Sequence, residues 1–400
     1  MISLAGRDIL HAWGKFLFTG IGLGLLIGVT LIMAGVYRGL VADARALLDN
    51  SGADLWVVQK DTQGPYAENS SLPDDAYRGI LGLEGVDRAA NVTYLTMQAH
   101  HRGRDVRIMV VGVAPGIPGA TPGWPRSLVA GRQIVLGHYE AVADVATGFA
   151  LGDRIAIRRH EYVVVGQTRR TVSSSGDPMV FIPLKDAQQA QFQKDNDAIR
   201  QSRRRAAANP GLNRPGNDSA LRAVLDSQAA NPYVNAVLVT LAPGADAAGV
   251  AGRIRRWTRL SVYTRAQMET ILVDKLVASS ARQIGMFLVI LALVSAAIVA
   301  FIIYTLTMDK IREIAVLKLI GTRSRTIAGM ILQQALALGL IGFMTGKIAA
   351  TFSAPLFPKY VLLMPADSIA GLAAILLICA LASLVAIRIA LRVDPANAIG

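Results

Sequence analysis

Long stretches of this chain lack charged residues altogether. Runs at 16–37, 284–308, 327–346 and 369–387 contain no Asp, Glu, Lys or Arg. The length of each run is close to or above the roughly 20 residues that an α-helix needs to cross about 30 Å of hydrocarbon. A composition that is 52% hydrophobic and only 17% charged excludes an ordinary water-soluble protein. The sequence therefore predicts an integral membrane protein with four transmembrane helices.

Residues for covalent, metal or proton chemistry are also scarce. The single cysteine, Cys379, lies in the last apolar run, so an intrachain disulfide is excluded. His100 and His101 are adjacent and would point to opposite faces of a strand, while His138 and His160 have no ligand partner at a suitable spacing. The apolar runs hold no carboxylate for an ion pathway. We expect no catalytic residue and no metal site.

A phosphate-binding loop of the G-x-x-x-x-G-K-[ST] type is missing, so this chain is not expected to hydrolyse ATP by that route. Basic residues, by contrast, are in excess: 41 Lys and Arg against 28 Asp and Glu give a formal net charge of +13. In a membrane protein such an excess fixes topology and attracts anionic lipid head groups. Nucleic acid is therefore not an expected partner.

Short basic loops stay in the cytoplasm, and this rule orders the chain. The first run is too long for a signal peptide and lacks an A-x-A cleavage site, so it reads as a retained anchor. In chain order we expect a cytoplasmic amphipathic helix (1–15), the first span (16–37), an external domain (38–283), the second span (284–308), a cytoplasmic coupling segment (309–326), the third span (327–346), an external loop (347–368), the fourth span (369–391) and a cytoplasmic tail (392–400).

The external domain is predicted to be a large α+β domain inserted between the first and second spans. Strands are expected at 53–60, 89–101, 105–113, 235–241 and 260–264, with helices at 73–83 and 246–257. These form a split porter-like part (about 53–113 and 234–264) around an inserted subdomain (about 114–233). The insert holds a strand at 179–183 and a hairpin, 154–159 and 162–168, that turns at His160 and Glu161.

Two further features of this region are expected. Residues 195–226, with the run Arg203, Arg204 and Arg205, read as a mobile polar loop with a solvated basic face. Residues 268–283 read as a helix that continues into the second span and acts as a stiff lever. Within the first span, Gly20, Gly24 and Gly28 repeat every four residues, the small-xxx-small pattern that lets two helices approach closely.

The coupling segment is a charged island between two apolar runs. Its cations are Lys310, Arg312, Lys318, Arg323 and Arg325, and its apolar residues Ile311, Ile314, Ala315, Leu317 and Leu319 recur at helical spacing. Gly321 stands where a helix C-cap is expected. From pattern alone, charges that only fix topology remain an equal alternative.

The order of these residues resembles a known family. REIAVLKLIGTRSRTI is similar to the R-E-I-G-x-L-[KR]-A-[LI]-G signature of MacB/FtsX-type (type VII) ABC transporter permeases. The segment departs at Ala315, where the family usually has Gly, and the tail RVDPANAI resembles the family's R-x-D-P-x-x-A ending. The resemblance implies docking of an ATPase subunit through residues that match or flank the signature: Lys310, Arg312, Glu313, Ile314, Leu317, Lys318 and Gly321.

The resemblance also implies a bacterial inner-membrane protein with both termini cytoplasmic and a periplasmic MacB-like domain. Expected partners are two ATPase subunits that bind ATP and Mg²⁺, a second permease copy or paralogue, a periplasmic adaptor, an outer-membrane duct and membrane lipids. Residues 53–71, ADLWVVQKDTQGPYAENSS, resemble the DevC branch, which is linked to glycolipid export. Export of a lipid, glycolipid or other amphiphile by mechanotransmission is the leading hypothesis. FtsX-like signalling to a cell-wall hydrolase and LolC/LolE-like lipoprotein extraction stay open.

Overall fold

The computed structural model of the chain divides into two compact units. Unit 1 comprises Met1–Leu40 and Ser279–Gly400, and unit 2 is Val41–Ala278. The structure describes residues 13–115, 121–126, 128–191, 201, 204–211, 233–357 and 359–392. Most of the expected N-terminal helix (1–15), most of the expected loop at 195–226, and the tail after Arg392 lie outside these residues.

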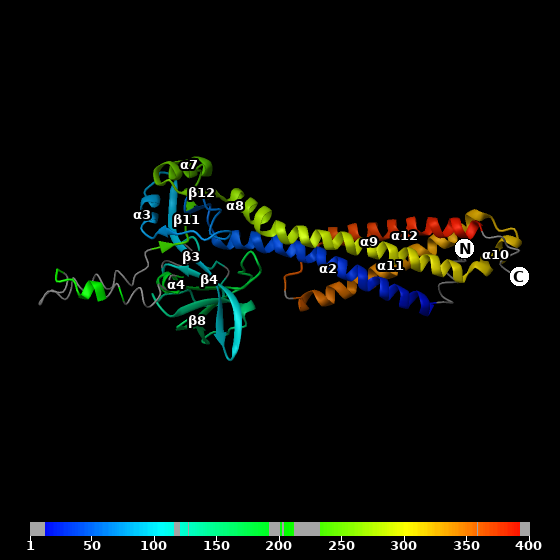
Figure 1. Cartoon of the computed structure of the whole chain (residues 1–400), viewed down its shortest axis with the longest axis horizontal. Helices are drawn as coiled ribbons and strands as arrows, with labels where there is room; N and C mark the ends of the chain where they lie inside the picture. Colours follow the sequence, from blue (N-terminus) through cyan, green and yellow to red (C-terminus); the bar gives the residue numbers. More distant parts are fainter. Residues whose placement is uncertain are drawn as a thin grey trace. The chain divides into compact units, whose positions relative to one another are not determined.

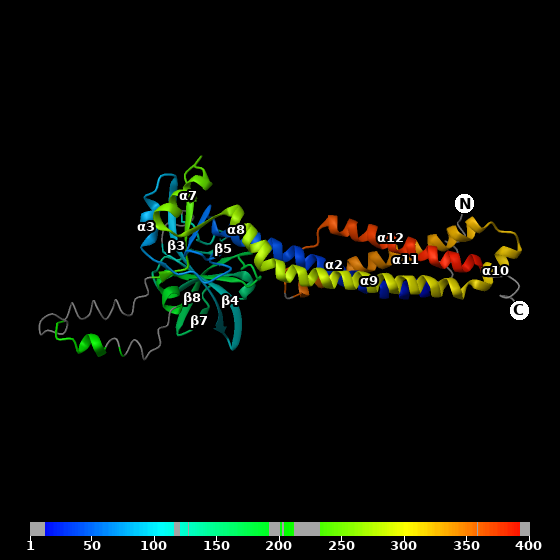
Figure 2. The same ribbon diagram turned by 45° about the horizontal axis from the view of Figure 1, so that its top comes forward.

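Unit 1 is helical, and its long helices lie side by side in both views of Figures 1 and 2. They are α2 (Trp13–Ser51, of which the last part belongs to unit 2), α9 (Ala278–Asp309), α11 (Ser324–Ser353) and α12 (Pro365–Arg392), with the short α10 (Ile311–Leu319) and a 3₁₀ turn, η3 (Ala354–Leu356). Within the described part of the chain, four helices are long and apolar enough to span a membrane: Leu17–Ser51, Arg282–Asp309, Ser324–Leu356 and Pro365–Leu391. The predicted four-span membrane fold is confirmed.

Glycine brings α2 and α11 into direct backbone contact. A Cβ built on Gly28 would lie 3.0 Å from the carbonyl oxygen of Gly346, and one on Gly20 would lie 2.6 Å from Cγ2 of Ile341. A Cβ on Gly24 would overlap Oγ1 of Thr345. Gly342 and Gly346 of α11 thus form a second small-xxx-small row opposite the one on α2.

A hydrogen bond and a second close contact reinforce this packing. The Thr345 hydroxyl donates to the carbonyl of Gly20 across the α2–α11 interface, with 3.2 Å between the oxygens. On another face of α11, a Cβ on Gly339 would lie 2.6 Å from the Cys379 sulfur of α12. Cys379 is fully buried, so the lone cysteine serves as a small apolar packing residue.

Unit 2 is built on a sheet whose central strand is unusually long. β3 (Val86–His101) forms a hairpin with β4 (Arg104–Val113), and the turn between them has positive φ at Arg102 and Gly103. The other strands are β1 (Leu55–Val58), β5 (Leu128–Gly131), β6 (Glu140–Asp144), β7 (Arg154–Ile157), β8 (His160–Thr168), β9 (Met179–Pro183), β11 (Ala236–Leu241) and β12 (Ser261–Thr264), with the pair β2 (Leu72–Pro73) and β10 (Tyr233–Val234) apart.

β3 changes its neighbour halfway along. Val86–Val92 pairs with β11, which continues through β1 to β12 as an open sheet. Ala99 and His100 instead pair with β7, and the pairings β3–β4, β4–β9, β9–β6, β6–β8, β8–β7 and β7–β3 close into a barrel. The two parts are therefore joined through one strand, and the division expected near residue 113 does not coincide with a break in the sheet.

Each part of unit 2 has its own apolar core. The barrel interior is filled by buried side chains such as Ile108, Phe149, Tyr162 and Ile182. The open sheet is covered by α3 (Ala76–Leu81) and α7 (Ala247–Thr258), whose Ile80 and Ile254 are fully buried. Asp246 caps α7 by accepting from the backbone N–H groups of Ala248 and Gly249 at 3.1 and 2.8 Å.

Several local expectations differ from the structure. The β7–β8 hairpin turns at Arg158 and Arg159, and His160 and Glu161 belong to β8, because Arg158 adopts the positive φ that the turn requires. The sequence pattern missed β5, β6 and α4 (Leu184–Gln191). The helix expected at 268–283 consists of α8 (Arg265–Ile271), a π-helical turn η2 (Leu272–Val277) and the start of α9.

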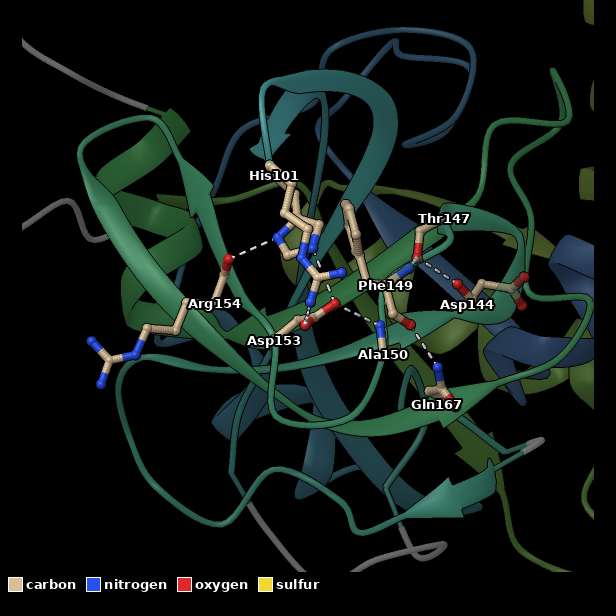
Figure 3. A network of polar contacts seen from close by, with 9 residues as sticks. His101, Asp144, Thr147, Phe149, Ala150, Asp153, Arg154 and Gln167 are labelled. Atoms are coloured by element: carbon tan, nitrogen blue, oxygen red, sulfur yellow. Dashed lines mark hydrogen bonds and ion pairs between the residues drawn. The ribbon is translucent and has the colours of Figure 1, made fainter.

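The tip of the β3–β4 hairpin is fixed to the barrel by a polar network (Figure 3). The two ring nitrogens of His101 lie 3.0 Å from the carbonyl oxygen of Arg154 and 3.0 Å from a carboxylate oxygen of Asp153. Asp153 also accepts a hydrogen bond from the Ala150 N–H. This bond is the main reason that the pKa of the Asp153 carboxyl is lowered, and the nearby Arg102 and His101 lower it further. The His101 and Phe149 rings meet in a T-shaped arrangement at a centroid distance of 5.4 Å.

A second buried carboxylate organises the loop before β6. Glu140 is 3% exposed, pairs with Arg132, and accepts from the backbone N–H groups of Val135 and Leu136 at 2.8 Å each. Burial alone would raise the pKa of Glu140, but Arg132 and the two N–H donors outweigh it and lower that pKa. The charged form therefore stabilises the fold above the pKa of an unfolded glutamate, and this contribution is lost as the pH falls through the lowered folded-state pKa.

We predict that Gly346→Ala destabilises unit 1, because its new Cβ would overlap the Gly24 carbonyl oxygen. Overpacking of this kind costs about 1–3 kcal/mol. Gly329→Ala is the matched control, since a Cβ at Gly329 of the same helix meets nothing within 4 Å. Thermal unfolding of the two variants in mild detergent measures the difference. Equal melting temperatures would contradict the close α2–α11 contact.

Glu140→Gln should lower the stability of unit 2 at neutral pH by about 1–3 kcal/mol, the usual worth of hydrogen bonds to a charged group. The loss should shrink as the pH is lowered, because protonation removes the same charge from the wild type. Glu161→Gln is the control, since Glu161 is 68% exposed and lies 3.8 Å from Arg154. Thermal unfolding across pH measures both variants, and a loss that does not change with pH would refute the charge argument.

Candidate functional site

The charged island between the second and third spans folds as one short helix. α9 ends at Asp309, α10 covers Ile311–Leu319, and α11 begins at Ser324. The residue at the N-cap position is Lys310, whose φ of −101° departs from helical geometry and sets the break between α9 and α10. Because so few residues join the three helices, α10 is held closely at both ends.

Gly321 ends α10 in a Schellman motif. The Thr322 N–H donates to the Leu317 carbonyl and the Gly321 N–H donates to the Lys318 carbonyl, each at 3.0 Å. Gly321 has a φ of 86°, which L side chains rarely adopt, so glycine is required for this helix end. The motif turns the chain from α10 into α11 within a few residues.

One side of α10 is anchored in the apolar core of unit 1. Ile314 and Ala315 are each 2% exposed, and Ile314 belongs to the same core cluster as Ile327 and Ile331 of α11. Leu317 is half-buried. The small side chain of Ala315, where the resembling signature usually has Gly, lies on this buried side.

The opposite side of α10 exposes apolar residues. Val316, Leu319 and Ile320 are 45%, 63% and 75% exposed. They follow Arg312 and Glu313, also exposed, at intervals of three and four residues, so these five residues share one face of the helix. We call this set the α10 outer face. An apolar centre edged by charge is the usual anatomy of a protein interface.

Lys318 connects α10 to α12. The Lys318 ammonium donates to the carbonyl of Leu391 near the end of α12, at 2.7 Å. A cation near the end of a helix can donate to one of the last helix carbonyls and interacts favourably with the helix dipole. Partial burial lowers the pKa of Lys310, an effect that the nearby Glu313 opposes. Lys318 therefore anchors α10 to α12.

The predicted coupling residues thus take different places on α10. Lys310 stands at its N-cap position, and Leu317 is half-buried. Arg312 and Glu313 lie on the outer face, Ile314 and Lys318 hold the helix in place, and Gly321 ends it. Ile314 is 2% exposed, so its side chain packs inside unit 1. Whether these residues couple to an ATPase remains a prediction.

Sequence reasoning missed the centre of the outer face. The apolar residues named from the sequence do not include Val316 and Ile320, and they include Leu319 only for its helical spacing. The sequence did contain one signal for an exposed apolar surface, the pair Leu319–Ile320 directly before Gly321. Where the chain turns at the end of a short helix, neighbouring apolar residues cannot all be buried. Among the described residues, no group of three or more His, Cys, Asp or Glu side chains is arranged to hold a metal ion.

Comparison with known proteins gives the family. The model of the MacB-like periplasmic core domain matches residues 16–257, and that of the FtsX-like permease C-terminal region matches residues 285–395. Uncharacterized ABC transporter permeases of Mycobacterium tuberculosis (strain H37Rv) and Mycobacterium bovis are each 24% identical over 403 residues, covering 100% of this chain and 99% of theirs.

Two solved structures resemble part of this chain. The periplasmic region of MacB from Actinobacillus actinomycetemcomitans covers 58% of this chain and 99% of its own length, with 7% identity and a TM-score of 0.37. The extracellular domain of the ABC-type transporter YknZ from Gram-positive bacteria covers 53% of this chain and 98% of its own length, with 12% identity and a TM-score of 0.32.

The two family models together span the first helix, unit 2 and the remaining spans, and the mycobacterial permeases align from end to end. The four membrane-spanning helices and the large α/β domain between the first two agree with this assignment. The chain therefore belongs to the MacB/FtsX-type family of ABC transporter permeases.

Proposed function

We propose that this permease couples ATP hydrolysis by a separate subunit to a conformational change in unit 2, and that it thereby exports an amphiphile. The observation that carries the coupling is the α10 outer face, where Val316, Leu319 and Ile320 are exposed on the segment between two spans. A cytoplasmic ATPase subunit is the partner that fits this position, with both chain termini on the same side of the membrane. That subunit would bind the ATP and Mg²⁺.

Force applied to α10 has a defined route into the membrane part. Ile314 joins α10 to the core around α11, and Lys318 joins it to α12. α10 is also linked directly along the chain to α9, and the helical run α8–η2–α9 continues along the chain into unit 2. η2 replaces the regular α-helical pattern at Leu272–Val277, a change often found at functional positions of helices.

The cargo is proposed to be a lipid, glycolipid or similar amphiphile taken up outside the inner membrane. The charge-free runs of the spans hold no carboxylate or basic side chain with which a polar solute could be held during passage. Small-residue contacts such as Gly28–Gly346 instead fill the space between α2 and α11. A second permease copy or paralogue, a second ATPase subunit, a periplasmic adaptor and an outer-membrane duct would complete the exporter.

Purification of the tagged chain from its native membrane in mild detergent, followed by mass spectrometry of every co-purifying protein, tests this function. We expect an ABC ATPase together with a periplasmic adaptor. An ATPase accompanied by a peptidoglycan hydrolase or its activator would replace export by signalling, and recovery of the intact chain with no ATPase would overturn the coupling proposal.

We predict that Leu319→Asp reduces ATPase association at least about tenfold, because a charge would be buried at the centre of the interface. Folding should be unaffected, since Leu319 is 63% exposed. Val129→Asp is the matched control: Val129 lies on β5 of unit 2 and is 48% exposed. Co-purification and stimulated ATP hydrolysis of the two variants provide the readout. Full association of Leu319→Asp would count against the outer face as the docking surface.

A further inference from the structure

Unit 2 contains a sizeable polar cavity outside both apolar cores. Its volume is about 650 Å³, within the range of about 300–1,000 Å³ typical of small-molecule sites. The side chains that matter for its chemistry are Tyr66, Glu68, Ser70, Tyr94, Thr96 and Gln191. They come from the segment after β1, from β3 and from the end of α4.

The cavity lies where β3 changes its neighbour. On that edge β3 pairs with β11 up to Val92 and with β7 from Ala99, so in the described residues no strand covers positions 93–98 between them. The Tyr94 N–H on this edge donates to the side-chain oxygen of Asn235 at 2.9 Å. Because backbone groups alternate along a strand, those of Thr96 face the same way. The strand thus presents donors and acceptors to the cavity wall.

A tyrosine pair forms the aromatic part of the wall. The Tyr66 and Tyr94 hydroxyls are 3.1 Å apart, and their rings meet edge to face at a centroid distance of 4.9 Å. The buried Trp56 donates its indole N–H to the Tyr66 hydroxyl at 3.2 Å. Burial raises the pKa of both tyrosines, so both hydroxyls stay neutral. The pair therefore offers rigid ring edges and uncharged hydroxyl groups.

Gln191 supplies an unused acceptor. Its amide nitrogen donates to Oδ1 of Asn235 at 3.0 Å, which fixes the orientation of the side chain. Its carbonyl oxygen is buried and has no hydrogen-bond partner among the described residues. An unpaired buried acceptor is unfavourable, so a ligand donor that reaches it gains binding energy.

The charge of the lining limits the ligand class. Glu68 is the sole charged side chain among the described lining residues, and its carboxylate already accepts from the Gln63 N–H at 3.0 Å. The same lining includes no Lys, Arg or His to hold a phosphate or carboxylate. Tyrosine rings, amides and hydroxyls with both donors and acceptors instead suit a neutral group rich in hydroxyls.

We propose that this cavity binds a glycosyl group, as a free saccharide or as the headgroup of a glycolipid. Sugar hydroxyls would donate to Oε1 of Gln191 and pair with the hydroxyls of Tyr94 and Thr96, while C–H groups of the sugar would pack on the ring of Tyr66. Binding itself is a property of unit 2 alone. Only the assignment of the bound sugar as exported cargo rests on the proposed function.

The test uses the full chain in nanodiscs of phosphatidylcholine and phosphatidylglycerol, prepared without glycoside detergents. Saturation-transfer NMR is recorded with methyl β-D-glucopyranoside and methyl β-D-galactopyranoside, and with tetramethylammonium as a cationic probe. We expect transfer to at least one glycoside and none to tetramethylammonium. Transfer to tetramethylammonium alone, or to no probe, would overturn the proposal.

Variants locate the site. Gln191→Leu and Tyr94→Phe should each weaken glycoside binding at least about fivefold. Gln189→Leu, at an exposed glutamine on α4, and Tyr139→Phe, at an exposed tyrosine on unit 2, should leave it unchanged. Thermal unfolding verifies that all four variants fold. Equal binding by the two cavity variants and their controls would place the sugar elsewhere and refute the proposal.

Nanodiscs that contain monoglucosyl diacylglycerol distinguish a glycolipid headgroup from a free saccharide as the ligand. Competition between this lipid and the free glycoside identifies a lipid headgroup, and the absence of competition identifies a free saccharide. Export and binding are also separable. If the chain binds a glycoside but recruits no ATPase, the sugar site stands and the exporter proposal falls. If the chain recruits an ATPase but binds no glycoside, the exporter proposal stands and the sugar site falls.

Discussion

In hydrocarbon, every backbone polar group must be satisfied within the helix, and burial of apolar surface no longer drives helices together. Unit 1 meets this constraint by close contact. The glycine rows of α2 and α11 let their backbones touch, and Gly339 accepts Cys379 of α12 in the same way. Packing this close holds the spans to one another.

α10 and the cavity beside β3 share one structural feature. In α10, a buried anchor at Ile314 and a lysine bond to α12 hold the helix, which leaves Val316, Leu319 and Ile320 outside. In unit 2, a strand that exchanges one neighbour for another leaves several residues uncovered on one edge. Both sites arise where a regular element is held firmly on one side and left without a partner on the other.

The membrane fold was predictable because charge-free runs long enough to span a bilayer are rare in water-soluble proteins. The position of Gly321 was also readable, since its conformation excludes most other residues. What the sequence did not reveal depended on distant pairing. The glycines of α11 could be recognised as a packing surface only once the fold places Gly346 beside Gly24. Likewise, the barrel closes only because β4 pairs in parallel with β9, some 70 residues away.

The shared strand β3 has a consequence for how unit 2 unfolds. Because its first half lies in the core of the open sheet and its second half in the wall of the barrel, neither part can open without disturbing a strand of the other. Local openings in proteins follow contiguous cooperative units. Two cores joined by one uninterrupted strand therefore constitute a single foldon, and a mechanical load on either half is resisted by both.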